Sequence, residues 1–138
     1  MNHFITAGIM IFSLIFIMGM GDLGGTAAVN QIPSPEKNFS AQVVDREGIE
    51  TSLSQFSQDG KIFVTGKRGS ATVAVPFDKI SWIQFQDPEK RDVPARLLLK
   101  DQSTVEMRLE KRSKFYGQAQ FGTFQIEIKD VNSIRFHP

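Results

Sequence analysis

The chain has 138 residues, a formal net charge of +1, 22% charged residues and no cysteine. A chain of this length holds one domain or two very small ones. The lack of cysteine excludes disulfides, thiolate metal sites, cysteine nucleophiles and a lipid-modified cysteine anchor. The near-neutral charge argues against a nucleic-acid partner, because domains that bind nucleic acid normally carry a marked basic excess.

The chain begins with an uncharged, mostly apolar run over residues 4–21, and small residues follow it as far as Thr26-Ala27-Ala28. This order is typical of a secretory signal peptide, so we expect residues 1–28 to be removed by cleavage after Ala28. The run is also long enough to be an uncleaved membrane anchor, and no Lys or Arg precedes it. Either alternative predicts an extracytoplasmic protein, periplasmic or secreted, that contacts a membrane only through this segment.

Residues 29–38 contain two prolines and no periodicity, which predicts a flexible linker. Beyond the linker, apolar and polar residues alternate, and helical spacing is absent. Alternation with a period of two predicts strands that bury one face. A first β unit over residues 39–86 is expected to hold strands near 40–45, 48–54, 61–66, 71–77 and 81–86.

Residues 87–94 are charged and include two prolines, so we expect them to link two units. A second β unit then covers residues 95–138. Its predicted strands lie near 95–100, 104–110, 114–117, 121–128 and 132–137. In both units a charged pair precedes the last strand, and Ile80 or Val131 is expected to fill the core across that turn.

The two units share one sequence pattern. Phe39–Leu53 aligns with Ala95–Leu109, and Phe63–Phe85 aligns with Lys114–Phe136, with a single gap between the blocks. A match at fixed offset indicates one supersecondary unit used twice. We therefore predict an all-β fold of two tandem pseudo-repeats, each with about five short antiparallel strands.

Each unit is close to the lower size limit for folding without a disulfide or a metal. The pseudo-repeats are therefore expected to share one core, in a single barrel or sandwich. The alternative is two small adjacent barrels, which are loosely similar to SH3-like or Sm-like modules in strand count and in one Asp-Gly turn.

The sequence contains no pattern that predicts an enzyme. The two histidines are His3, in the apolar leader, and His137, next to the C-terminus, so a histidine-based relay or metal site is not expected. No glycine pattern fits a phosphate loop, and no acidic loop fits calcium. We predict no catalytic residue, no metal and no cofactor. A hydrolase that uses paired carboxylates, such as those near Asp87 and Asp101, is the weakest alternative.

Five residues form the candidate interaction surface: Trp82, Pro76, Arg108, Lys111 and Arg112. The single tryptophan alternates with the core pair Ile83 and Phe85 and aligns with a serine in the second unit, so the shared pattern does not require it. Such a tryptophan suits an anchor for a partner. The proline predicts either a bulge or an edge strand, and an edge would be either protected or open to strand addition. The basic cluster is typical either of a binding surface or of a charged strand edge.

The function that these patterns favour is a non-enzymatic interaction or structural module of the cell envelope, with another envelope protein as its partner. The alternative is a module that binds a small molecule, a glycan or a lipid in a cleft between the units.

Overall fold

The computed structural model describes residues 33–138, so the predicted leader and the first part of the predicted linker lie outside the described residues. The described chain is all-β, as predicted, and consists of strands and two short 3-10 helices. The first five strands are β1 (Ala41–Asp45), β2 (Glu50–Gln58), β3 (Phe63–Arg68), β4 (Ala71–Pro76) and β5 (Ile80–Phe85). The next five are β6 (Asp92–Leu99), β7 (Thr104–Glu110), β8 (Lys114–Ala119), β9 (Gly122–Glu127) and β10 (Val131–Phe136).

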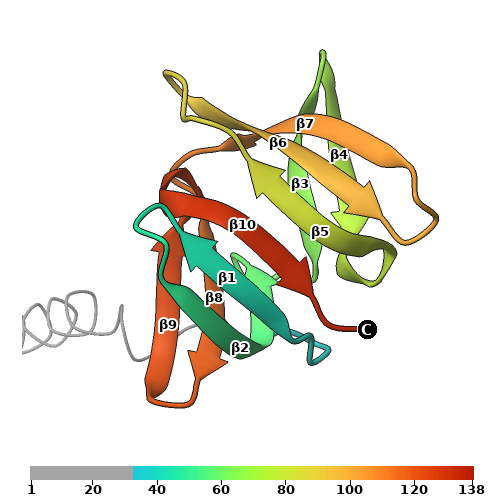
Figure 1. The fold of residues 1–138 in the computed structure, drawn as a ribbon. Coiled ribbons are helices and arrows are strands. Elements are labelled where there is room, and N and C mark those ends of the chain that lie inside the picture. The colour runs from blue at the N-terminus through green and yellow to red at the C-terminus, as the bar shows by residue number, and fades with distance from the viewer. Residues whose placement is uncertain (1–32) are drawn as a thin grey trace, which may run out of the picture. The chain divides into compact units, whose positions relative to one another are not determined.

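All ten strands belong to one curled antiparallel sheet, whose order is β4-β3-β7-β6-β5-β10-β1-β2-β8-β9. The strands β5 and β10 lie next to each other in its middle (Figure 1). In the strand order, five strands lie on each side of the junction between β5 and β10. Read inward from one end, the order is β4-β3-β7-β6-β5, and read inward from the other end it is β9-β8-β2-β1-β10. Each strand of one series lies five places away in the chain from its counterpart in the other. The sheet therefore has an internal symmetry about the junction of β5 and β10.

Each side of the sheet takes strands from both halves of the chain. The hairpin β3–β4 pairs with β7, and the hairpin β8–β9 pairs with β2. The chain consequently crosses from one side to the other twice, once between β2 and β3 and once between β7 and β8. We call residues 59–62 and 111–113 the two crossover connections.

A single hydrophobic core spans both halves of the chain. Phe56 of β2 stacks on Phe115 of β8, with ring centroids 5.2 Å apart. Phe77 lies 5.4 Å from Phe56 and 4.9 Å from Phe136 of β10, again between centroids. Aromatic rings at these separations gain stabilisation beyond the area that they bury. Because one core connects the halves, the described chain has a shared interior and not two separate small barrels.

The predicted turn before the last strand of each half is a single turn of 3-10 helix. These helices are η1 (Phe77–Lys79) and η2 (Ile128–Asp130). Ile80 and Val131, which follow them, are fully buried, as the sequence predicted.

One large hydrophobic residue next to β2 is on the surface. Ile49 is 59% exposed, although its spacing from the buried Leu53 would put both on one face of a strand. The carboxylate of Asp45 accepts hydrogen bonds from the backbone N–H groups of Glu47 and Ile49, both at 2.9 Å. These bonds hold Ile49 in the turn before β2, where period-two alternation does not apply.

Two predicted connections contribute to the folded domain. Within the predicted linker, Pro35 is buried, and the side chain of Asn38 accepts a hydrogen bond from the backbone N–H of Gln55 at 2.8 Å. The strand β6 begins at Asp92, inside the predicted link between the units. Across residues 33–138, no helix has both the length and the apolar character needed to cross a membrane.

Candidate ligand-binding cleft

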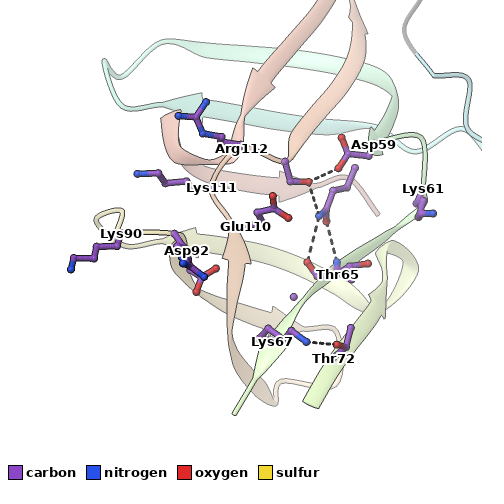
Figure 2. A pocket seen from close by; sticks show the side chains of 14 residues that line it. Asp59, Lys61, Thr65, Lys67, Thr72, Lys90, Asp92, Glu110, Lys111 and Arg112 are labelled. Atoms are coloured by element: carbon purple, nitrogen blue, oxygen red, sulfur yellow. Dashed lines mark hydrogen bonds between the residues drawn. The ribbon is translucent and has the colours of Figure 1, made fainter. Parts of the chain in front are cut away.

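A cleft of about 630 Å³ lies where the two crossover connections meet the link between β5 and β6. Its volume falls in the range of about 300–1,000 Å³ that is typical of ligand sites. Figure 2 shows its polar and charged lining. The lining residues are Gln58, Asp59, Lys61, Thr65, Gly66, Lys67, Thr72, Lys90, Arg91, Asp92, Glu110, Lys111, Arg112 and Ser113. Because these residues come from both halves of the chain, only the folded domain assembles the cleft.

The wall of the cleft is a connected hydrogen-bond network centred on Gln58. This side chain is 6% exposed; its amide donates to the carbonyl of Thr65 at 3.4 Å and to the hydroxyl of Ser113 at 3.2 Å. The backbone N–H of Thr65 donates to its oxygen at 3.1 Å. The hydroxyl of Ser113 in turn donates to the carboxylate of Asp59. A buried amide that is satisfied in this way holds its partners in one arrangement.

The same network fixes the second crossover connection against the first. The backbone N–H of Asp59 donates to the carbonyl of Lys114 at 3.0 Å. The backbone N–H of Lys111 donates to the carbonyl of Arg91 at 3.0 Å, and its own carbonyl accepts from Lys129 at 3.1 Å. Backbone hydrogen bonds to Arg91 and Lys129 therefore hold the connection that carries Lys111 and Arg112.

The cleft holds six cations, namely Lys61, Lys67, Lys90, Arg91, Lys111 and Arg112. Lys67 donates to the hydroxyl of Thr72 at 2.8 Å. For the other five, no side-chain hydrogen bond or ion pair exists within residues 33–138, where the ion pairs connect Arg46 with Asp87, Arg96 with Glu106, and Lys129 with Asp130. The positive charge of the cleft is consequently not neutralised by direct pairing.

Two of the three carboxylates in the cleft oppose each other across β6 and β7. Asp92 and Glu110 are direct partners in the antiparallel register. Side chains at such positions lie on one face, and like charges there are destabilising. In the view of Figure 2, these two carboxylates lie between Lys61 on one side and Lys90 and Lys111 on the other.

The structure divides the predicted interaction surface into separate places. Lys111 and Arg112 line the cleft. Arg108 lines a smaller neighbouring hollow, where its guanidinium donates to the carbonyl of Gly69 at 3.0 Å. The strand β7 lies between β3 and β6, so the interpretation of this basic cluster as a charged strand edge is wrong.

Trp82 and Pro76 lie away from the cleft. Trp82 is half-buried on the central strand β5, where its register partners are Leu98 and Arg135. Pro76 is exposed at the end of β4, and β4 is the terminal strand of the sheet, as the proline predicted. These two residues therefore do not belong to the same surface feature as Lys111 and Arg112.

Sequence reasoning missed Gln58, Lys61, Lys67, Lys90 and Arg91. The sequence did contain an indication of Gln58 and Lys61, because both lie in the single gap of the internal alignment. Nine residues separate Leu53 from Phe63, whereas four separate Leu109 from Lys114. The residues without a counterpart form the first crossover connection and its approach, and they supply one wall of the cleft.

Comparison with known proteins gives a family but no activity. A family model described as "Uncharacterised protein" matches residues 35–138, and the chain belongs to this family. No curated protein matches the chain. Over the part of the chain that the structure describes, no group of three or more His, Asp or Glu side chains is arranged to hold a metal ion.

Proposed function

We propose that this protein is a non-catalytic binding module of the cell envelope that holds an anionic ligand in the cleft at the crossover connections. One observation carries the proposal: five cations line one concave surface with no side-chain partner in residues 33–138. Cations gathered in a cleft raise the local concentration of anions. They also form charge-assisted hydrogen bonds, which are stronger than bonds between neutral groups.

Export of the protein is part of this proposal. It is supported by the apolar run over residues 4–21 and by the small residues that follow it. The binding domain would then face an extracytoplasmic space, either free after cleavage or attached through that run.

We also infer that β1–β5 and β6–β10 are two copies of one unit. The aligned sequence blocks support this origin, and so does the symmetrical strand order. Ligand sites occur preferentially at interfaces between structural units. The lining residues of the cleft come from both copies.

A second candidate function is docking of another envelope protein by strand addition. Its supporting observation is that β4 is a terminal strand of the sheet that residues 33–138 form. Replacing Ala74 of β4 with proline would remove one backbone donor from that edge. Loss of a co-purifying envelope protein from Ala74→Pro, with ligand binding intact, would favour this candidate.

The main experiment measures binding of inorganic tripolyphosphate to the full-length protein by calorimetry. We expect binding that weakens as NaCl rises from about 50 mM to about 200 mM, because salt screens exposed charges. The double variant Lys111→Glu/Arg112→Glu reverses two cations in the cleft. Its affinity should fall by about tenfold or more, which corresponds to about 1.4 kcal/mol.

The matched control is Lys79→Glu/Lys100→Glu. These two lysines are exposed neighbours outside the cleft, joined by a backbone hydrogen bond from the N–H of Lys100 to the carbonyl of Lys79 at 2.9 Å. The control makes the same change in net charge and should keep its affinity within about twofold of the original. Equal losses in the two double variants would reject the cleft as the binding site.

A further inference from the structure

The cleft contains more than cations, and its composition narrows the chemical class of the ligand. This inference rests on the proposed function, which is the binding of an anionic ligand at this site. Carboxylates and hydroxyl groups are interleaved with the lysines and arginines of the lining. A surface that recognised only negative charge would be weakened by carboxylates, since they repel anions.

The pair Asp92 and Glu110 indicates that the ligand has a second property besides negative charge. The two carboxylates are direct cross-strand partners, and neither forms an ion pair within residues 33–138. Like charges at opposed positions cost stability. Uncharged side chains would remove this cost without disturbing the backbone. The carboxylates therefore suit a ligand that offers hydrogen-bond donors next to its anionic groups, because an ionised carboxylate only accepts hydrogen bonds.

Aromatic side chains are absent from the described lining of the cleft. Proteins that bind single-stranded nucleic acid stack the bases on aromatic rings, with about 1–3 kcal/mol for each base. The bases would find no such platform here. A DNA oligonucleotide, which lacks the 2′-hydroxyl, would also offer few hydroxyl donors to Asp92 and Glu110.

We infer that the ligand of the cleft is an acidic glycan. Its carboxylate, sulfate or phosphate groups would pair with Lys61, Lys111 and Arg112, and its sugar hydroxyls would donate to Asp92 and Glu110. An acidic glycan combines regularly spaced anions with hydroxyl donors, which matches the alternation of cations and carboxylates around the cleft.

The test compares four anionic probes, with a neutral dextran oligosaccharide as control, on the full-length protein and on the variant Asp92→Ala/Glu110→Ala. The probes are an oligogalacturonate, a heparin oligosaccharide, inorganic tripolyphosphate and oligo(dT). The first two separate a carboxylate ligand from a sulfated one. We expect the original protein to bind at least one of the two glycans more tightly than oligo(dT).

The variant should change the affinities in opposite directions. Loss of the two acceptors should weaken glycan binding by about tenfold, equivalent to about 1.4 kcal/mol. Loss of two negative charges should strengthen binding of tripolyphosphate and oligo(dT). A neutral dextran oligosaccharide should not bind either protein. Thermal unfolding of the variant is measured in parallel, and we expect an unchanged or slightly higher midpoint because a repulsion has been removed.

The outcomes separate this inference from the proposed function. Stronger binding of all four anionic probes by the variant would overturn the glycan inference and leave anion binding intact. Tighter binding of oligo(dT) or tripolyphosphate than of both glycans would likewise overturn the glycan inference and leave anion binding intact. Failure of every anionic probe to bind would overturn the proposed function itself, and the inference with it.

Discussion

The two halves of the domain, β1–β5 and β6–β10, place their strands alike but differ in how the second strand of each reaches the third. In the first half, β2 extends to Gln58, which makes a network of side-chain hydrogen bonds across the sheet. In the second half, β7 ends at Glu110, and a short connection carries Lys111 and Arg112. The matching segments build the frame, and the unmatched ones supply most of the cleft lining, which Thr65, Gly66, Lys67 and Thr72 of the matching segments complete. The symmetrical strand order thus contains one asymmetric cleft.

The largest predicted change in stability comes from two glycines at which paired strands approach each other closely. A Cβ atom added at Gly66 of β3 would lie 2.6 Å from the carbonyl oxygen of Arg108 on β7. At Gly117 of β8 it would lie 2.9 Å from Cβ of Leu53 on β2. Gly66→Ala should lower the free energy of unfolding by about 3 kcal/mol, and Gly117→Ala by about 1–2 kcal/mol, because backbone yields less readily than a side chain.

Urea denaturation followed by circular dichroism measures both glycine variants. Ser70→Ala, in the exposed turn between β3 and β4, is the control and should be within about 0.5 kcal/mol of the original protein. If both glycine variants were as stable as the control, the strands would not approach as closely as described.

The network in the first half should give the next largest effect. Gln58→Ala leaves the backbone N–H of Thr65 without its acceptor in a part-buried site. The loss should be about 2 kcal/mol of unfolding free energy, in line with the cost of an unsatisfied buried group. The same change at exposed Gln125 of β9 should be nearly neutral in urea denaturation. A neutral Gln58→Ala would mean that the network does not hold the crossover connections together.

The carboxylate pair of the second half predicts a small gain. Glu110→Gln removes the like-charge repulsion with Asp92. We expect the free energy of unfolding to rise by about 0.5 kcal/mol. The gain should shrink at high salt, since both groups reach solvent. A decrease of about 0.5 kcal/mol or more would contradict the prediction and would show that Glu110 has a stabilising partner.

The smallest effect concerns two equivalent hairpins. Asp45 and Asp101 both accept a hydrogen bond from the backbone N–H two residues ahead, each at 2.9 Å. Asp101 also accepts from the hydroxyl of Ser103 at 2.5 Å, and these bonds lower its pKa. Because the folded-state pKa is lowered, the stabilisation is present above the ordinary carboxyl pKa of about 3.9 and is lost as the pH falls through the lower value. Ser103→Ala should move the pKa of Asp101 upward in an NMR titration.

The sequence predicted most of the frame and little of the site. Period-two alternation located all ten strands to within a few residues, because burial of one sheet face depends on local spacing. The sequence pattern also identified Ile80 and Val131 as buried core residues. It does not account for Ile49, which has the spacing of the buried Leu53 but is exposed in a turn that Asp45 holds. Among the cleft residues, it selected Lys111 and Arg112 for their charge but passed over Gln58.

By itself, the sequence determined that the described chain is all-β, where its strands lie and which residues face its interior. Only the tertiary structure decided which strands became neighbours. The pairing of β3 with β7 and of β8 with β2 joins residues far apart in the chain, and no local spacing encodes that choice. The cleft depends on it, because Gln58 and Ser113 meet only when the two connections cross.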